Sequence, residues 1–474
     1  MRCLYNIFQT QLRLQPEKIY LYSNYGELSY RQVDEIIHTY ADLLDLEMKN
    51  VTDRIVASSY SSPEKMFFLI WACVLSDTSL LLLPPLKDTH HVEKKLLEAK
   101  AVFLISDVEE LKPVSKCIDF EEIIKDAKKE TGRKAKRKKE DNGSFIFYTS
   151  GTTGVPKLVK VEYSQFDQAI DCLFRNKFME YTKNKTVYIV PPLFHSYGLS
   201  SMLEYTRAGS SIKLPKEISH LGPIKELVNK NSGEKITAIE GVPYFYDNMS
   251  LVLKKLHLPN LKHIGFGGDA VKQEIVEKLS NNYDGVTFSI RYGLTETPSI
   301  VSIKVLKAPY ENPKCSGRLL PIYTVDIRKE NERDKDGAIY IKGRCIGKYL
   351  NDKKGNMEWF ETGDYGYLEG NSLYITGRKS AFLKIRGYRI SPVIIETVIR
   401  SFENVNDCMV YSTNNQLMAK IVIEEKECFS MQGLVQMLHK KVPDYCIPEQ
   451  IYFTEKIPRT LSGKIVRSVI PDAI

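Results

Sequence analysis

Residues 145–166 have the sequence FIFYTSGTTGVPKLVKVEYSQF, and they are the most informative part of the chain. Their apolar start, Phe145 to Tyr148, is typical of a buried β-strand. The strand is followed by six hydroxylated or glycine residues, Thr149, Ser150, Gly151, Thr152, Thr153 and Gly154. Glycines let the backbone approach a ligand closely, whereas amides, hydroxyls and the ammonium of Lys157 offer partners to phosphate oxygens. The segment therefore predicts a phosphate-binding loop at the end of a strand.

This loop differs from the Walker motif GxxxxGK[ST] of P-loop nucleotidases. Its two glycines, Gly151 and Gly154, are three residues apart, and Lys157 follows three residues later, directly after Pro156. Taken alone, the segment is also compatible with a flexible turn rich in glycine and threonine. The motifs in the rest of the chain decide between these two interpretations.

Helical patterns alternate with short β-rich runs through the first three quarters of the chain. The runs include residues 102–105, 186–190 and 211–214. Such alternation predicts α/β sheets with helices on their faces. Beyond about Tyr340 the strands shorten and glycines become frequent, which predicts a small mixed domain with helices at 392–402 and 431–441. Because the 474 residues exceed the roughly 250–300 at which single cores stop growing, we expect at least two domains.

The net charge of +8 is concentrated in one segment. Residues 125–140 contain nine basic and three acidic residues, so they account for six of the eight net positive charges. Charge runs of this kind are usually solvated loops, although a nucleic acid, a membrane or an acidic carrier protein is an alternative partner. A nucleic-acid-binding surface would interleave basic and aromatic residues, so the concentration of charge argues against nucleic acid.

Cysteine usage and apolar runs predict where the protein resides. Nine cysteines are spread from Cys3 to Cys446 without a CxxC pair, which indicates reduced thiols and neither a disulfide framework nor a zinc cluster. Residues 1–14 lack the apolar stretch of a signal peptide. The most apolar run, Phe67 to Leu75, is too short to span a bilayer and predicts a buried helix. We therefore expect a cytoplasmic protein without a transmembrane segment.

Further motifs follow the loop along the chain. They are PPLFHSYGL at 191–199, GGDAV at 267–271, RYGLTET at 291–297, FETGDYGYLEG at 360–370, ITGRKSAFLKIRGYRI at 375–390 and PRTLSGKIVR at 458–467. With these motifs the sequence resembles the adenylate-forming (AMP-binding) superfamily of acyl-CoA synthetases, stand-alone and peptide-synthetase adenylation domains, and luciferases. The resemblance covers nearly the whole chain. It implies a large multi-sheet α/β N-terminal domain, residues 1–376, and a small mobile α+β C-terminal domain, residues 377–474.

The resemblance also implies an acid–thiol ligase. Such an enzyme uses ATP and Mg²⁺ to convert a carboxylic acid into an acyl adenylate and pyrophosphate. It then transfers the acyl group to the thiol of CoA or of a carrier protein's 4'-phosphopantetheine. Two anions must approach each other while pyrophosphate leaves, so neutralisation of negative charge dominates the chemistry.

The family's catalytic residues correspond to three positions of this sequence. By the resemblance, the loop 149–154 and Lys157 hold the leaving phosphates. Thr295 is implied to hydrogen-bond the α-phosphate, and Glu296 is implied to give Mg²⁺ the hard oxygen ligand that it prefers. Lys464 matches the lysine that bridges the carboxylate and the α-phosphate, a task suited to a compact ammonium on a flexible stem.

The remaining nucleotide contacts are also implied by the resemblance. Tyr292 is implied to pack on adenine, Asp364 to accept hydrogen bonds from both ribose hydroxyls, and Arg378 to add a ribose contact. The other implied nucleotide-binding residues are Gly267, Gly268, Asp269, Ala270, Arg291 and Gly293. The small domain is implied to rotate about Ser380, where the family usually carries Asp or Lys.

The acid pocket is implied to include Phe194, His195 and Gly265. Adenylation domains that accept α-amino acids place an Asp after this phenylalanine, where it pairs with the ammonium. Here His195 follows, and an unpaired buried ammonium is poorly stabilised, so we expect a non-amino aryl or acyl acid. An amino-acid adenylation domain, a luciferase-like oxygenase and a non-catalytic interaction module are the alternatives.

The thiol acceptor stays open at this point. Residues 384–390, KIRGYRI, resemble adenylation domains that work with carrier proteins. In contrast, Ser391-Pro392 followed by Glu396 resembles the CoA ligases. The sequence therefore supports both CoA and a carrier protein, and it leaves the identity of the acid and the oligomeric state undetermined.

Overall fold

The computed structural model describes residues 3–116, 118, 120–129, 142–149, 157–219, 221–229, 233–306, 315–350, 358–378, 383–385, 388–390, 392–413, 416–423, 429–442, 446–460 and 465–467. The chain divides into two compact units. The N-terminal unit comprises residues 1–313, 317–324 and 342–358, and the C-terminal unit comprises residues 314–316, 325–341 and 359–474. The predicted domain boundary after residue 376 stays a prediction.

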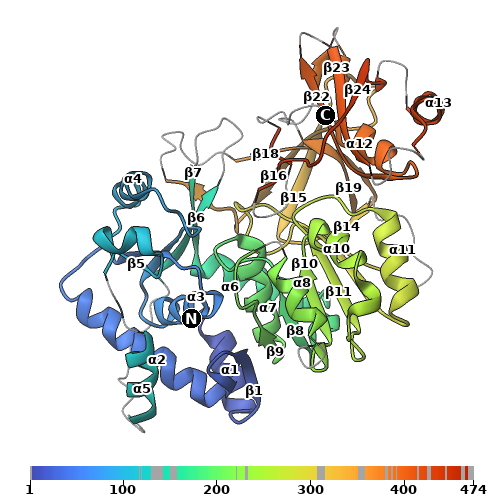
Figure 1. The fold of residues 1–474 in the computed structure, drawn as a ribbon. Coiled ribbons are helices and arrows are strands. Elements are labelled where there is room, and N and C mark those ends of the chain that lie inside the picture. Colours follow the sequence, from blue (N-terminus) through green and yellow to red (C-terminus); the bar gives the residue numbers. More distant parts are fainter. Residues whose placement is uncertain are drawn as a thin grey trace. The chain divides into compact units, whose positions relative to one another are not determined.

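The first sheet of the N-terminal unit has a parallel centre and antiparallel strands at its edges (Figure 1). Its strand order is β2 (Gly26–Ser29), β1 (Ile19–Ser23), β9 (Ser211–Lys213), β8 (Thr186–Ile189), β10 (Ala238–Gly241), β11 (His263–Gly267), β12 (Thr287–Tyr292), β13 (Ser302–Leu306) and β14 (Cys315–Leu319). The strands from β1 to β12 in this order are parallel. Because carboxyl ends of parallel strands meet at one edge, the segments that follow β10, β11 and β12 lie together.

The second sheet of the N-terminal unit carries the predicted phosphate loop. Its strand order is β17 (Lys348–Tyr349), β7 (Lys157–Glu162), β6 (Ser144–Thr149), β4 (Ser79–Leu82), β3 (Ile55–Ser59) and β5 (Phe103–Ser106). β6 runs parallel to β4, and β7 returns antiparallel beside β6. The predicted strand before the loop is therefore confirmed, and the loop connects two neighbouring strands.

Helices of the N-terminal unit cover both sheets (Figure 1). They are α1 (Asn6–Leu14), α2 (Tyr30–Glu47), α3 (Pro63–Leu75), α4 (Thr89–Ala99), α5 (Phe120–Lys129), α6 (Tyr163–Arg175), α7 (Ser196–Arg207), α8 (Gly222–Val228), α10 (Pro243–Ser250) and α11 (Gln273–Asn282). The helix α7 packs against β8 and β9 of the first sheet, and α6 packs against α7 and β7. This pair of helices therefore links the two sheets.

The predicted buried helix is confirmed as α3. Ser62 caps it by accepting a hydrogen bond from the amide of Lys65, and Pro63 occupies its first turn, where no amide donor is needed. All residues from Phe67 to Leu75 are buried. Its Trp71 ring contacts Tyr5 and other aromatic side chains of the largest hydrophobic core. No helix of the described residues is both long enough and apolar enough to cross a membrane.

The C-terminal unit has an antiparallel sheet, a hairpin and a three-stranded sheet (Figure 1). The strands are β15 (Tyr323–Arg328), β16 (Gly337–Gly343), β18 (Phe360–Glu369) and β19 (Ser372–Arg378), then β20 (Leu383–Ile385) and β21 (Tyr388–Ile390), then β22 (Val405–Thr413), β23 (Gln416–Ile423) and β24 (Gln450–Phe453). Both predicted helices are confirmed, as α12 (Pro392–Arg400) and α13 (Met431–Lys441). α12 ends two residues earlier than the predicted range of 392–402. The apolar sides of the two helices share one core with β22 and β23.

Several predicted features fall outside the described residues. They are residues 150–156 of the loop, the hinge Ser380, the lysine Lys464 and most of the basic segment 125–140. Their predicted roles stay predictions.

Candidate active site

The ends of the predicted phosphate loop are held next to each other. Thr149 and Lys157 are paired across β6 and β7, and the Thr149 hydroxyl donates to the Lys157 carbonyl oxygen at 3.1 Å. Lys157 is exposed, and its ammonium lies 4.9 Å from the ring centroid of Tyr349 on β17. The register of β17 beside β7 therefore places an aromatic ring under the lysine that was predicted to contact phosphate.

Tyr349 also joins this lysine to the predicted magnesium ligand. Its hydroxyl donates a hydrogen bond to Oε1 of Glu296 at 2.5 Å. The Glu296 carbonyl oxygen accepts a hydrogen bond from the Gly347 amide at 2.7 Å, two residues before Tyr349. Lys157, Tyr349 and Glu296 therefore form one cluster, in which a carboxylate is oriented by a tyrosine and a cation lies close by.

Thr295 and Glu296 are displayed by a tight turn after β12. The Thr297 hydroxyl bonds both the amide of Leu294, at 2.9 Å, and its carbonyl oxygen, at 3.1 Å. Thr297, whose hydroxyl holds the turn, is buried, whereas Thr295 and Glu296 are half-buried. The two predicted catalytic side chains therefore remain accessible, because the turn leaves the side chains of Thr295 and Glu296 partly exposed to solvent.

The predicted adenine-binding segment follows the neighbouring strand β11. A Cβ atom at Gly267 would lie 2.9 Å from the Tyr197 ring, and Gly268 has φ of +87°, so both positions favour glycine. Asp269 and Ala270 are exposed, and the Asp269 carboxylate accepts a hydrogen bond from the Ala270 amide at 2.8 Å. Since Gly267 and Arg291 are paired across β11 and β12, this segment lies beside the half-buried Tyr292 and the exposed Gly293.

The predicted pocket residues come from two elements. Phe194 is buried, and its ring centroid lies 4.6 Å from that of the half-buried His195, which precedes α7. Gly265 lies in β11, where an added Cβ would meet the carboxylate of Glu240 at 2.1 Å. Glu240 therefore packs directly against the backbone of the predicted pocket, which the sequence interpretation had not anticipated.

Arg291 takes part in a buried charged network. Its guanidinium bonds Glu204 on α7, Glu240 on β10 at 3.3 Å and the Ser201 hydroxyl at 3.1 Å. The side chain of Arg291 is 3% exposed, and those of both glutamates are fully buried. Burial opposes the charge of Arg291, but the two carboxylates outweigh it and raise the pKa of Arg291 above its usual value. Its predicted contact with nucleotide stays a prediction.

Hydroxyl groups donate further hydrogen bonds to the two carboxylates, whereas Nε of Arg291 is buried without a hydrogen-bond partner among the described residues. Tyr197 and Tyr205 donate to opposite oxygens of Glu240 at 2.8 and 2.9 Å, and the Ser299 hydroxyl donates to Glu204. Burial raises the pKa of Glu204, while Arg291 acts in the opposite direction. A glutamate inside the apolar strand segment 238–241 was a usable sequence signal, because charged residues are rarely buried without partners.

Asp364 and Arg378 lie in the C-terminal unit. They are paired across β18 and β19, with 3.5 Å between Arg378 Nε and Asp364 Oδ1. The Asp364 side chain is 10% exposed and that of Arg378 is 42% exposed, so the pair is accessible from one side. Their predicted contacts with ribose stay predictions.

A buried histidine on β11 of the first sheet gives a prediction about the pH dependence of stability. The Nδ1 and Nε2 atoms of His263 lie 2.9 and 3.0 Å from the hydroxyls of Thr287 and Ser289, and its ring stacks on Tyr181 at 4.0 Å. Burial lowers the pKa of His263 well below 6.5, and Lys185 acts in the same direction. The folded protein thus holds this side chain neutral.

Unfolding would let His263 bind a proton below its unfolded pKa of 6.5, so stability should fall as the pH is lowered through that value. We expect the free energy of unfolding to drop by about 1.5 kcal/mol more between pH 6.5 and 5 in the parent protein than in His263→Gln. Urea unfolding at several pH values measures this difference. Equal pH dependence of the two proteins would contradict the neutral assignment.

Comparisons with known proteins cover both units. The AMP-binding enzyme family matches residues 8–349, and the AMP-binding enzyme C-terminal domain matches residues 394–464. The chain is 25% identical over 430 residues to 2-succinylbenzoate–CoA ligase of Bacillus subtilis, covering 86% of each chain. It is 26% identical over 386 residues to 4-coumarate–CoA ligase CCL1 of Humulus lupulus, covering 76% of this chain and 69% of the relative. It is also 27% identical over 356 residues to gramicidin S synthase 2 of Aneurinibacillus migulanus, covering 69% of this chain and 8% of that protein.

Solved structures share the fold. O-succinylbenzoate coenzyme A synthetase of Bacillus subtilis in complex with AMP gives a TM-score of 0.81 at 23% identity, covering 99% of this chain and 98% of that one. The anthranilate CoA ligase AuaEII in complex with anthranoyl-AMP gives 0.83 at 18% identity, covering 98% and 95%. These similarities confirm the predicted fold class, a large α/β part followed by a small C-terminal part.

Proposed function

The chain belongs to the AMP-binding enzyme family, and on that premise we propose that it joins a carboxylic acid to the thiol of CoA at the expense of ATP. The observation that carries the proposal is the cluster of Lys157, Tyr349 and Glu296. In this cluster a cation lies at the end of the predicted phosphate loop, and a carboxylate oriented by a tyrosine lies nearby. These are the groups needed for a nucleotide whose phosphates are bound together with Mg²⁺.

The residues of the N-terminal unit fit ATP and Mg²⁺. Glu296 offers hard carboxylate oxygen, and Mg²⁺ is usually bound by one or two carboxylates together with substrate phosphates. Lys157 would neutralise the leaving phosphates, and the hydroxyl of Thr295 would donate to the α-phosphate. When bound, the metal would neutralise charge on the phosphates. Lys464 as the lysine of adenylation and Ser380 as the hinge belong to the same proposal.

Tyr349→Phe tests whether the tyrosine orients the metal ligand. The substitution removes the hydroxyl bonded to Glu296 and keeps the ring beneath Lys157. Because partners behind metal ligands typically contribute 10–100-fold to metal affinity or activity, we expect the Mg²⁺ concentration for half-maximal adenylation to rise about 10-fold. A magnesium titration of pyrophosphate exchange measures it. Tyr148→Phe, a tyrosine on β6 whose hydroxyl contacts His91, is the control and should leave the titration unchanged.

The pocket supports an acid without an α-amino group. The Glu240 carboxylate next to Gly265 already accepts hydrogen bonds from Tyr197, Tyr205 and Arg291 and is fully buried. A substrate ammonium would have to displace these donors, at the cost of leaving them unpaired. The names of the CoA ligases reported above further suggest an aromatic acid, and we propose that class together with CoA as the acceptor.

A substrate panel tests this function. ATP–pyrophosphate exchange would be measured with benzoate, 4-coumarate, 2-succinylbenzoate, octanoate and phenylalanine. Each active acid would then be offered CoA or a pantetheinylated carrier protein. We expect exchange with an aromatic acid and thioester formation on CoA. Exchange with phenylalanine alone would contradict the proposal and favour an amino-acid adenylation domain. Transfer to the carrier protein alone would contradict CoA as the acceptor.

A further inference from the structure

Two arginines flank the segment that contains Lys464. Arg459 binds Asp407 of β22, with Nη2 at 2.8 and 2.6 Å from the two carboxylate oxygens and Nε at 3.2 Å from Oδ2. The side chains of Arg459 and Asp407 are 13% and 22% exposed. A guanidinium that holds a carboxylate through two nitrogens fixes its orientation as well as its position. One end of the segment is therefore attached to β22.

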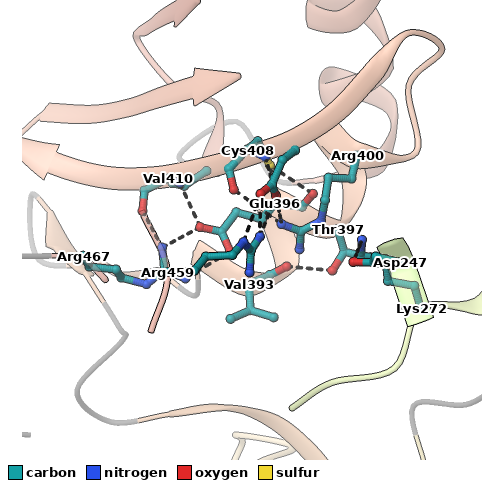
Figure 2. A network of polar contacts seen from close by, with 11 residues as sticks. Asp247, Lys272, Val393, Glu396, Thr397, Arg400, Cys408, Val410, Arg459 and Arg467 are labelled. Carbon is teal, nitrogen blue, oxygen red and sulfur yellow. Dashed lines mark hydrogen bonds and ion pairs between the residues drawn. The ribbon is translucent and has the colours of Figure 1, made fainter. Parts of the chain in front are cut away.

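The second arginine attaches the other end. Arg467 holds Glu396 of α12, with Nη1 at 2.5 Å from Oε1 and Nη2 at 3.0 Å from Oε2, and Nη1 also donates to the Val410 carbonyl oxygen at 3.0 Å. The same Glu396 carboxylate accepts the Val410 amide at 2.8 Å, and its side chain is 1% exposed. Figure 2 shows Arg467 and Glu396 close to Val410 of β22. Each partner of Arg467 is thus itself held in place.

Backbone contacts bring the two attached ends together. Arg459 and Ile465 form an antiparallel bridge, and the Val466 amide donates to the Pro458 carbonyl oxygen at 2.9 Å. The residues between the bridged positions include Lys464, which lies outside the described residues. Both ends of this short connection therefore have fixed positions on the C-terminal unit.

The attachment points belong to one packed body. Glu396 lies on α12, Asp407 lies on β22, and these two elements share a core that includes Ile395, Ile399 and Cys408. The Cys408 thiol also donates to the Glu396 carbonyl oxygen at 3.4 Å. A packed helix and strand hold a side chain more reproducibly than a loop does.

We propose that Arg459 and Arg467 are positioning residues that set the location of Lys464 for acyl-adenylate formation. The inference rests on the proposed function, in which Lys464 acts in that step. The ammonium is carried on a flexible stem, so its location depends on where its backbone is held. Displacement of a catalytic group by about 1 Å can lower the rate about 100-fold. Loss of either arginine's ion pair is therefore expected to slow acyl-adenylate formation.

A double-mutant cycle between Arg467→Met and Lys464→Ala tests the coupling. Pyrophosphate exchange with the most active acid of the panel reports adenylation, and thioester formation from that acid's pre-made adenylate reports the second step. Arg459→Met is the second variant, because Arg467→Met leaves the buried Glu396 unpaired and can impair folding. Arg328→Met, which removes an exposed pair with Asp326 in the same unit, is the matched control. Urea unfolding checks that each variant is folded.

We expect Arg467→Met and Arg459→Met to lower kcat of exchange about 10- to 100-fold with KM for ATP changed less than threefold. Thioester formation should change less than threefold, and Arg328→Met should resemble the parent. In the Lys464→Ala background, Arg467→Met should cause little further loss, because its effect acts through the missing ammonium. A purely structural role would instead reduce both steps alike.

Three results would overturn the inference while sparing the proposed function. The first is full exchange activity in folded Arg459→Met and Arg467→Met when Lys464→Ala is inactive. The second is an additive loss in the double-mutant cycle, and the third is an equal loss in both half-reactions. Full exchange activity in Lys464→Ala itself is a different outcome, which would remove the assigned role of Lys464 and the inference with it.

Discussion

Lys464→Ala is expected to reduce acid-dependent pyrophosphate exchange by about 10²–10³-fold while a pre-made acyl adenylate is still converted to thioester. Acyl-adenylate formation brings a carboxylate and the α-phosphate together, and the lysine would neutralise the charge that develops between them. The second step starts after this bond has formed, so it needs the ammonium far less. Comparing the two half-reactions in one preparation measures the separation.

Lys456→Ala is the matched control for this prediction. Lys456 is an exposed lysine of the same C-terminal unit, eight residues earlier in the chain. Its removal changes the net charge equally and should leave both half-reactions unchanged. If Lys464→Ala kept full exchange activity, or if both lysines had the same effect, the assignment of Lys464 would be wrong.

Arg291→Met is expected to lower the free energy of unfolding by about 3–5 kcal/mol. The substitution leaves Glu204 and Glu240 fully buried without their cation. Uncompensated buried charge costs more than the loss of an ion pair at the surface, because neither carboxylate can regain water in the folded state. Urea unfolding at neutral pH measures the change.

Arg31→Met is the control for this substitution. Arg31 pairs with Glu17 at 2.7 Å, but the two side chains are 56% and 72% exposed, so its removal should cost under about 1 kcal/mol. Adding Glu204→Gln and Glu240→Gln to Arg291→Met should recover part of the lost stability, since both uncompensated charges are removed. A loss below about 1 kcal/mol in Arg291→Met would contradict the account of this network.

One strand and three helices could be predicted from short sequence patterns. The strand before the predicted phosphate loop, the buried helix α3 and the helices α12 and α13 follow from apolar runs, caps and prolines within a few residues. Strand ends were less accurate: the run 186–190 became Thr186–Ile189, and 211–214 became Ser211–Lys213. Hydrogen-bonded register decides where a strand ends, and register depends on a partner strand that a local pattern does not contain.

Long-range pairing explains what the sequence did not predict at the site. Tyr349 lies in a two-residue strand, and only its register beside β7 brings it to Lys157 and Glu296. Arg291 belongs to a motif that implied a nucleotide contact, yet its guanidinium meets a glutamate 87 residues away in the sequence. Such partners are brought together by strand order and helix packing, which the motif does not encode.

Acid-dependent exchange of labelled pyrophosphate into ATP is the most direct test of the central claim. We predict that label enters ATP only when Mg²⁺ and a carboxylic acid of the panel are both present. We further predict that CoA then yields thioester and AMP in equal amounts. Release of ADP and phosphate, or exchange that does not depend on any acid, would contradict this claim.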